Sequence, residues 1–420
     1  MQTERELSPD SHSPRYRWYM LGLAALTHTL VVAMPRICMP VLFVEIAEDL
    51  GLDVVQVGWL WGMASLGGIF VVLIGGLMGD RFGVKRVLWV ACLLAGIAGA
   101  LRGISGSYAT LVATVIVFGL IQGVIPVNVH KTARVWFSGR RLGMANGVLS
   151  MGMGLGFTIG AMISSVVLSP LLGGWRNVLF FYGTISVVIA ILWSMARERP
   201  DKDDTQASQE STVPFRQALS RVARNKTVWL FGLVLLGQVG AIQGLVGYLP
   251  WYLKEYKSWS GPQADGILAA FNLTSTIFTI PLALLSDRLG SRRAILIPAM
   301  LVTVIGIGLL SVVNGAPVWL LAIAIGIFRD GFMAVFITMI MEIKGVGAIY
   351  AGTAVGLAFT IERVGVVLAP PLGNWLANID PGLPFVFWAA LAAATLFVFC
   401  FMKTKGSSIN LKTMAERKRR

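Results

Sequence analysis

The chain carries little charge and almost no cysteine or histidine for its length. Of its 420 residues 13% are charged, whereas an ordinary soluble domain carries roughly 25%. The 3 cysteines, Cys38, Cys92 and Cys400, all fall inside apolar stretches and lack the paired spacing of a zinc site or a disulfide framework. The sequence also lacks a phosphate-binding loop, a nucleophile elbow and a dinucleotide fingerprint. We therefore expect no metal, no cofactor and no enzymatic activity.

Apolar residues dominate what is present. They make up 56% of the chain, and the mean hydropathy is +0.74. Continuous runs such as LVATVIVFGL at 111–120 do not alternate, which excludes a lipid-spanning barrel. Most runs exceed the roughly 20 residues that a helix needs to cross hydrocarbon. We predict an all-α integral membrane protein with twelve transmembrane helices at 18–47, 57–79, 87–105, 110–134, 142–169, 177–196, 227–253, 265–286, 294–313, 317–342, 348–375 and 383–403.

The distribution of basic residues predicts the topology. Loops expected on one side hold only Arg102, Arg176, Lys254 and Lys257 of the 35 basic residues, and most of the others fall on the side of the two termini. Because cytoplasmic loops collect Lys and Arg, we expect both termini in the cytoplasm and the chain in a plasma (inner) membrane. The first run lacks a cleavage site and is predicted to be retained. The net charge of +14 is then a topology signal, not a sign of nucleic-acid binding, and the basic tail is expected to touch membrane lipids.

A polar stretch divides the chain into two similar halves. We predict an N-terminal segment at 1–17, a six-helix bundle at 18–196, a cytoplasmic linker at 197–226, a second six-helix bundle at 227–403 and a tail at 404–420. Asp80 and Asp287 lie 207 residues apart in similar loops, and the GMANG that starts at Gly143 and the GTAVG that starts at Gly352 lie 209 residues apart. Two matches at nearly one spacing indicate an internal duplication, and hence two pseudo-symmetric bundles.

One loop motif occurs in both halves. After the second run it comprises Gly76, Asp80, Arg81, Gly83, Lys85 and Arg86, and after the eighth run it comprises Asp287, Arg288, Gly290, Arg292 and Arg293, with Ala283 in place of the first glycine. On these residues the chain resembles the major facilitator superfamily. Within it, the placement of the charged residues described below resembles that of the monocarboxylate and oxalate carriers. The resemblance covers the whole chain and implies a gate at both loops and a central cavity between the halves. The family's drug exporters carry a glycine-proline signature in the fifth span, which this chain matches in part, with Ala161 in place of proline.

Five charged residues lie near the middle of the predicted spans. Arg36 is in the first span, Arg329 and Asp330 are in the tenth, and Glu362 and Arg363 are in the eleventh. A charge at such a position costs about 2.5–3.5 kcal/mol on insertion scales and marks a functional candidate. Three cations against two carboxylates favour an anionic substrate, which the arginine fork binds well. Neighbours on a helix point about 100° apart, so we expect cross-helix pairs such as Asp330 with Arg363. A structural ion-pair cluster between the halves is an open alternative.

The sequence thus predicts a secondary transporter that works as a monomer by alternating access. Arg36, Arg329 and Arg363 are expected to bind a small, monocarboxylate-like organic anion, and Asp330 or Glu362 to carry protons in symport, with anion exchange as the other mode. Further substrate-binding candidates, each equally explained by helix–helix hydrogen bonding, are Gln122, Asn128, Gln238, Gln243 and Asn272. Alternatives are a proton-driven exporter of drugs or lipophilic cations, and a receptor that retains the fold without transport.

Overall fold

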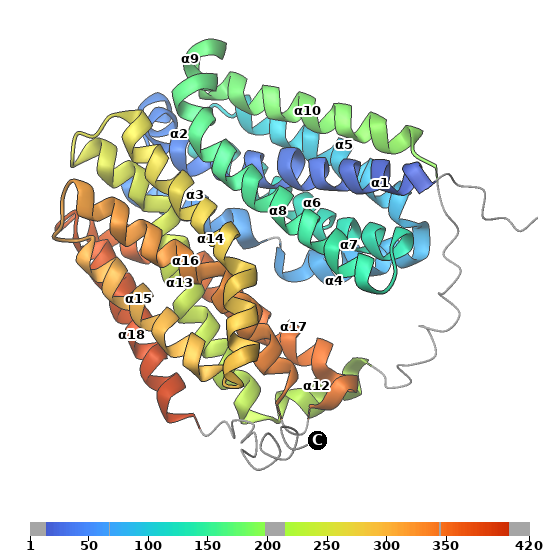
Figure 1. Cartoon of the computed structure of the whole chain (residues 1–420). Coiled ribbons are helices and arrows are strands. Elements are labelled where there is room, and N and C mark those ends of the chain that lie inside the picture. Colours follow the sequence, from blue (N-terminus) through green and yellow to red (C-terminus); the bar gives the residue numbers. More distant parts are fainter. Residues whose placement is uncertain (1–13, 67, 198–214, 344–345, 403–420) are drawn as a thin grey trace, which may run out of the picture.

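A computed structural model of the chain describes residues 14–66, 68–197, 215–343 and 346–402, in which every regular element is a helix (Figure 1). Most of the expected N-terminal segment, part of the linker and the basic tail lie outside these residues. The first half contains α1 (Pro14–Leu26), η1 (Thr27–Ala33), α2 (Met34–Leu50), α3 (Val54–Leu66), α4 (Gly68–Phe82), α5 (Val84–Gly103), α6 (Tyr108–Gln122), α7 (Ile125–Trp136), α8 (Arg140–Ile163), η2 (Ser164–Leu168), α9 (Ser169–Leu172) and α10 (Trp175–Met195). The second half contains α12 (Phe215–Ala223), α13 (Lys226–Glu255), α14 (Gly261–Leu289), α15 (Arg293–Leu309), α16 (Ala316–Met341), α17 (Gly347–Leu376) and α18 (Leu383–Phe401).

These elements form twelve crossings of a membrane, as predicted. Among the described residues, 10 helical segments are long and apolar enough to span, and α3 and α15 are shorter apolar helices. Three of the long segments combine several elements: Arg15–Leu50 joins α1, η1 and α2, Tyr108–Trp136 joins α6 and α7, and Arg141–Leu172 joins α8, η2 and α9. The helices run past the expected ends of several spans. For example, α14 begins at Gly261 because a capping box of Ser260 and Gln263 satisfies its first turn.

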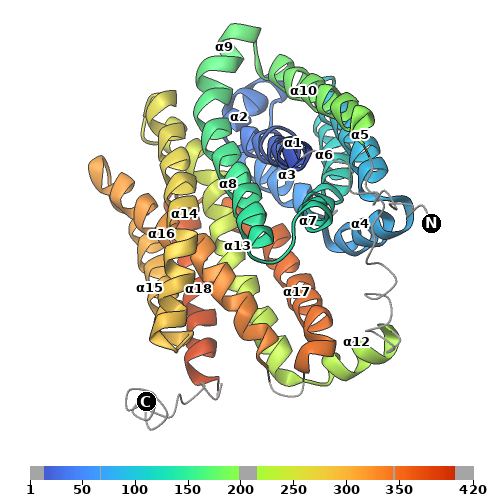
Figure 2. The same cartoon turned by 45° about the vertical axis from the view of Figure 1, so that its right-hand side comes forward.

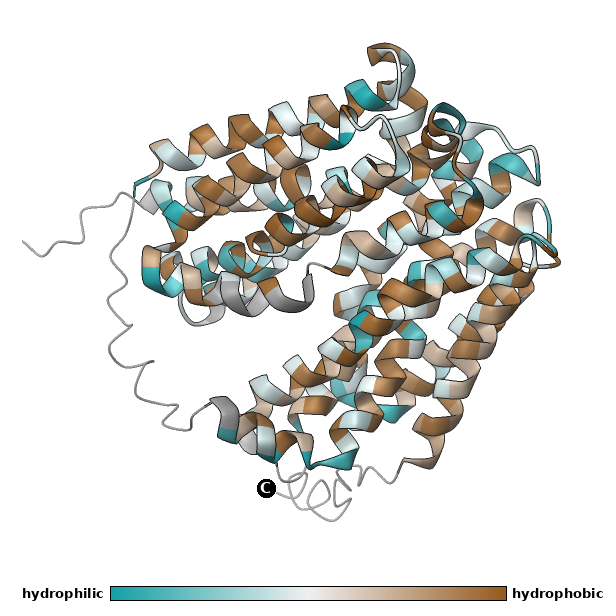
Figure 3. Cartoon of the chain, turned by 180° about the vertical axis from the view of Figure 1, so that it is seen from behind, coloured by the Kyte–Doolittle hydropathy of each residue, from teal (hydrophilic) through white to brown (hydrophobic). Residues whose placement is uncertain are grey.

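Two bundles, α1–α10 and α13–α18, meet on one side of the molecule and diverge toward the other (Figures 1 and 2). We call the side where α1 begins and α18 ends the terminal side, and the opposite side the far side. Each bundle has an apolar core of its own. A third core takes residues from both bundles, among them Ala47 near the end of α2, Val54 at the start of α3 and Leu253 near the end of α13, all at the far ends of their helices. Hydrophobic helices therefore tie the bundles together at the far side, and Figure 3 shows the same divergence from behind.

Close backbone packing sets the position of α17 in the second bundle. A Cβ atom added at Gly365 of α17 would lie 2.2 Å from the backbone oxygen of Leu236 in α13, and one added at Gly240 would lie 3.0 Å from the oxygen of Gly365. Small residues allow such approach between helices in lipid. Because α17 carries Glu362 and Arg363 less than one turn before Gly365, this contact also fixes the height of those two charges.

We expect Gly365→Ala to destabilise the protein by about 1–3 kcal/mol, because the new methyl group overpacks a backbone contact that cannot yield. Gly356→Ala on the same helix is the matched control, since nothing lies within 4 Å of its added Cβ. The control is expected to be neutral or to stabilise by up to about 1 kcal/mol. Thermal unfolding in detergent measures both. Equal losses would mean that the Gly365 contact is not tight.

Candidate functional site

Three arginines from both bundles converge where the bundles meet. Arg36 lies in α2 directly after Pro35, Arg329 lies in the middle of α16, and Arg363 lies in the middle of α17. Arg36 is within electrostatic range of Arg363 and Arg329, and also of Glu362. The side chains of Arg329 and Arg363 are each 27% exposed, so neither is sealed in a core. The structure therefore brings together the arginines that the sequence places on three separate spans.

Neutral groups hold two of these guanidinium groups. Nη2 of Arg36 donates to Oγ of Ser65 in α3, at 3.4 Å. Nη1 of Arg329 donates to Oδ1 of Asn272 in α14, at 3.0 Å, and its Cζ lies 5.3 Å from the centre of the Phe271 ring. An amide, a hydroxyl and an aromatic face orient a cation without cancelling its charge. Both arginines are thus positioned in advance but remain available to an anion.

The expected cross-helix pairing of Asp330 with Arg363 is wrong. Nε of Arg329 lies 3.7 Å from Oδ1 of the adjacent Asp330, and Nε of Arg363 lies 3.6 Å from Oε2 of the adjacent Glu362. The long arginine side chain bends back along the helix and reaches its neighbour, which the 100° separation of the Cα–Cβ bonds does not prevent. Both distances exceed a hydrogen bond, so neutralisation is partial. Glu362 is 5% exposed, whereas the Asp330 side chain is 42% exposed.

The five uncharged candidates differ in what their side chains contact. Gln122 donates to the carbonyl groups of Val31 and Val32 in η1, Asn128 donates to Gly75 in α4 and to Val124, and Gln238 donates to Ala392 and Thr395 in α18. Gln243 has a buried Nε2 without a hydrogen-bond partner in the part of the chain that the structure describes. Asn272 alone of the five bonds to one of the three arginines.

Arg102 is a buried arginine that sequence reasoning missed. It was expected in an outward-facing loop, yet it lies in α5 and is 1% exposed. Its Cζ lies 3.7 Å from the centre of the Phe118 ring, and its Nη1 donates to the carbonyl oxygen of Pro35 at 3.2 Å. A basic residue at the end of an apolar run looks like a loop residue in one dimension. The inward direction of its side chain was not visible in the sequence.

Lys254 was also wrongly expected in an outward-facing loop. It lies in α13, where its Nζ donates to the carbonyl oxygen of Val41 in α2 and to Asp265 in α14, both at 2.9 Å. Asp265 is completely buried and accepts a hydrogen bond from Ser165 in η2. Two further hydrogen bonds join the two bundles. Nε1 of Trp61 donates to the carbonyl oxygen of Gln243, and Nδ2 of Asn374 donates to the carbonyl oxygen of Val54. We call Lys254, Asp265 and Ser165 the far-side lock.

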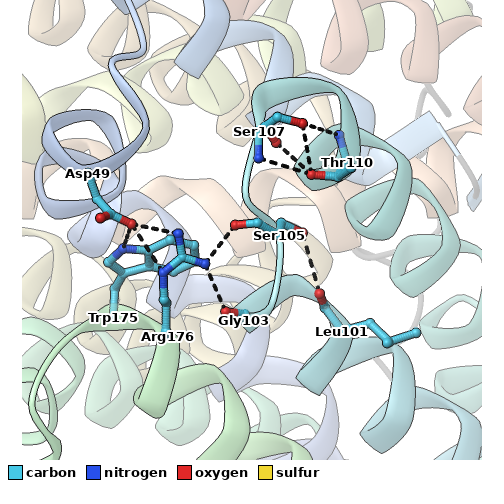
Figure 4. A network of polar contacts seen from close by, with 8 residues as sticks. All are labelled: Asp49, Leu101, Gly103, Ser105, Ser107, Thr110, Trp175 and Arg176. Atoms are coloured by element: carbon cyan, nitrogen blue, oxygen red, sulfur yellow. Dashed lines mark hydrogen bonds and ion pairs between the residues drawn. The ribbon is translucent and has the colours of Figure 1, made fainter.

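A second network on the far side stays within the first bundle (Figure 4). Arg176 of α10 donates from Nη2 to Oδ2 of Asp49 at 2.7 Å and from Nη1 to the carbonyl oxygens of Gly103 and Ser105, at 3.0 and 2.6 Å. Nε1 of Trp175 donates to the same carboxylate. The network holds the end of α2 and the α5–α6 loop to α10, and so it fixes the end of the helix that carries Arg102.

The gate-motif residues lie on the terminal side in both bundles. In the first bundle Asp80 at the end of α4 pairs with Lys131 of α7, and Gly83 supplies a positive φ of 82° before α5. In the second bundle Asp287 pairs with Arg292, which also reaches Glu342 at the end of α16. The hydrogen bond that Arg292 donates to the Asp287 carboxylate raises the pKa of Arg292. These ion pairs stay within their own bundles.

The remaining motif residues lie near helix ends. Gly76, Arg81, Lys85 and Arg86 lie on either side of the α4–α5 junction. Arg288 lies in the last turn of α14, which Gly290 caps with a φ of 62°, and Arg293 donates to the carbonyl group of Met402 at the end of α18. The motif thus stabilises a short turn between two helices in each bundle. The two copies of the motif in the sequence lie at equivalent helix junctions of the two bundles.

Twelve crossings in two bundles, with charged groups gathered where the bundles meet, define the class of secondary transporters. A family model described as Major Facilitator Superfamily matches residues 21–266 and 245–419, and the chain belongs to that superfamily. The resemblance inferred from the loop motif is confirmed. Membership also makes this chain a multi-pass membrane transporter and not an enzyme.

Several named relatives are similar to the chain. "Probable nitrate/nitrite antiporter NarK1" from Thermus thermophilus is 30% identical over 66% of this chain and 63% of its own length. "Probable sulfoacetate transporter SauU" from Cupriavidus necator is 27% identical over 91% of this chain and 94% of its own. The "3-(3-hydroxy-phenyl)propionate transporter" of Escherichia coli is 23% identical over 86% of this chain and 88% of its own.

Solved structures show the same fold. A bacterial homologue of the human lysosomal transporter Spinster, in an inward-facing and occupied conformation, has a TM-score of 0.75 and 14% identity, covering 93% of this chain and 97% of that one. The nucleoside transporter NupG has a TM-score of 0.76 and 13% identity, covering 92% and 100%.

Lys254→Met is expected to destabilise the protein by about 3–5 kcal/mol, because it leaves the Asp265 charge buried without its cation. Adding Asp265→Asn should recover part of that loss, since the double variant has no uncompensated charge. Thermal unfolding in detergent measures the cycle. Lys257→Met is the control, a lysine near the same end of α13 whose Nζ lies over the Tyr252 ring. A double variant no more stable than Lys254→Met, or an equal loss in the control, would contradict the charge pairing.

Proposed function

We propose that this protein is a secondary active transporter of a small organic anion that works by alternating access. The observation that carries the proposal is the cluster of Arg36, Arg329 and Arg363. Two bundles contribute to it, and its two carboxylates lie beyond hydrogen-bonding distance of the nearest guanidinium nitrogen atoms. A guanidinium group in a low-dielectric site is stabilised most by an anion that accepts two parallel hydrogen bonds. A carboxylate meets that requirement.

The relatives support an anionic substrate. The names of three of them specify nitrate or nitrite, sulfoacetate and 3-(3-hydroxy-phenyl)propionate, all of which are anions near neutral pH. The last two are organic acids, and the monocarboxylate-like substrate that the sequence predicts belongs to the same chemical class. Asn272, which accepts a hydrogen bond from Arg329, would add a neutral hydrogen-bonding group to the substrate site.

The arrangement of contacts supports alternating access. The shared apolar core and the far-side lock join the bundles at the far side, whereas the ion pairs of the gate motif stay within each bundle. If the termini are cytoplasmic in an inner membrane, as the basic loops predict, this arrangement is an inward-facing state. Outward opening then requires the lock to break. We propose a monomer in contact with membrane lipids, because each copy has its own site between its two bundles.

Proton coupling fits Glu362 better than Asp330. Glu362 is 5% exposed and within electrostatic range of Arg363 and Arg36, so its charge and that of a bound anion act on the same arginines. A carboxylate that takes up a proton when the anion binds, and loses that proton when the anion is released, could link the two fluxes in symport. Anion exchange without protons is the other mode of the same site.

The rival function is proton-driven export of drugs or lipophilic cations. Asp330 favours it, because its side chain is 42% exposed and could face a cation. Asp330→Asn would abolish drug resistance in cells under this rival and leave anion uptake largely intact. Loss of anion uptake without any change in resistance would exclude it.

Arg329→Ala is expected to reduce anion uptake into proteoliposomes at least about thirtyfold, or about 2 kcal/mol, because it removes a charge-assisted pair of hydrogen bonds to the anion. Membrane insertion and thermal stability should change little. Arg329→Lys keeps the charge but loses the fork, and should retain part of the activity. Radiolabelled acids that the unaltered protein carries serve as probes.

The matched control for Arg329→Ala is Arg221→Ala on α12, whose Cζ lies 5.1 Å from the centre of the Tyr350 ring. It should transport normally. Normal uptake by Arg329→Ala would refute the assignment of Arg329.

Glu362→Gln is expected to remove the acceleration of uptake by an inward proton gradient, because the amide can neither bind nor release the proton. Exchange of labelled for unlabelled anion, which needs no net proton movement, should persist. Uptake measured with and without the gradient tests this. Gradient-driven uptake that survives Glu362→Gln but not Asp330→Asn would assign the proton to Asp330.

A further inference from the structure

We propose that Arg102 and Arg36 form a second anion subsite, so that the substrate of this transporter carries two acidic groups. The inference rests on the proposed function and narrows its substrate class. One acidic group would bind the cluster of Arg36, Arg329 and Arg363, and the other would bind Arg102. Three features of the protein support this subsite: the unmet bonding capacity of Arg102, the pocket that it shares with Arg36, and the balance of charge.

Arg102 has bonding capacity that the protein leaves unused. Its Nη1 donates to Pro35, its Nε donates to Gly99 at 3.4 Å, and its guanidinium plane lies over Phe118. Its Nη2 is buried and has no hydrogen-bond partner among the described residues. A buried donor without a partner costs more free energy on a charged group than on a neutral one. An acceptor with negative charge would remove that cost.

A pocket connects Arg102 with the central cluster. Its lining includes Arg36, Arg102, Gln122, Trp61 and Phe118. The side-chain amide nitrogen of Gln122 donates to the carbonyl groups of Val31 and Val32 in η1, so Gln122 is held in place in the pocket wall. The aromatic walls keep the local dielectric constant low, which strengthens the attraction between a guanidinium group and an anion. Since Arg36 belongs to both the pocket and the cluster, a single short molecule can engage both.

The balance of charge decides the number of acidic groups. Arg36, Arg102, Arg329 and Arg363 contribute four positive charges, and Asp330 and Glu362 contribute two negative ones. The only ionisable group that acts on Arg102 electrostatically, among the described residues, is the thiol of Cys38. A monoanion would leave one guanidinium group unmatched, whereas a dianion matches both surplus charges. The cost of an unpaired buried charge therefore favours the dianion.

Binding of matched acids to the purified full-length protein tests the inference. Succinate, glutarate and sulfoacetate are the dianionic probes, and butyrate and valerate are monoanions of matched carbon number for the first two. Near neutral pH all are fully ionised. Titration calorimetry in detergent gives the affinity ratio of dianion to monoanion for the unaltered protein, Arg102→Met, Arg102→Lys and Arg329→Gln.

The unaltered protein is expected to prefer at least one dianion over its matched monoanion. In Arg102→Met, which keeps an apolar stem over Phe118, the ratio should fall at least about thirtyfold. Arg102→Lys keeps the charge and supports folding, but its single ammonium group reaches only one acceptor, so the ratio should fall about tenfold. Arg134→Gln on the exposed face of α7 is the control and should keep the ratio within about twofold.

The outcomes separate the two proposals. An equal loss of dianion and monoanion binding in the Arg102 variants would assign Arg102 a purely structural role and overturn the inference. An unchanged ratio of dianion to monoanion affinity in Arg102→Lys would also overturn the inference. A preference of the unaltered protein for monoanions would overturn it too, but if Arg329→Gln abolishes that monoanion binding, the proposed function stands. Binding of none of the acids, or binding of all of them unaffected by Arg329→Gln, would overturn both.

Discussion

Positive charge held in a low-dielectric interior without full compensation is the constraint on which this structure depends. Arg36 and Arg329 are oriented by a serine hydroxyl, an asparagine amide and an aromatic ring, none of which cancels their charge. The carboxylates of Asp330 and Glu362 lie 3.7 and 3.6 Å from guanidinium nitrogen atoms, beyond a good hydrogen bond. A site built in this way is stabilised by an anionic ligand, and the ligand gains most when it touches both bundles.

The two ends of the molecule are held by different kinds of contact. At the far side a shared apolar core and the buried pair of Lys254 with Asp265 join the bundles. At the terminal side the pairs Asp80–Lys131 and Asp287–Arg292 each stay within a bundle and stiffen it. Rigid bundles joined at one end can rock about the charged site between them, and the far-side contacts set the free energy of that motion.

The order of apolar runs and motifs along the sequence was enough to predict the transmembrane helices and their division into two bundles. Continuous apolar runs gave the twelve crossings, because each crossing must satisfy its own backbone hydrogen bonds in lipid. The repeated loop motif gave the duplication and the family. Other inferences failed where they depended on side-chain direction: Arg102 and Lys254 were assigned to loops but lie inside the protein. Asp330 and Glu362 contact their sequence neighbours, not the opposite helix.

The sequence by itself determined that the chain crosses a membrane twelve times in two related halves and that Arg36, Arg329 and Arg363 lie inside the spans. Hydropathy, motif spacing and the cost of intramembrane charge are properties of single segments, so they can be read without knowing any neighbour. Only the tertiary structure decided which groups meet: the convergence of the arginines, the inward turn of Arg102 and the pairing of Lys254 with Asp265. Those contacts depend on helix rotation and tilt, which packing between helices sets, and no single segment encodes either.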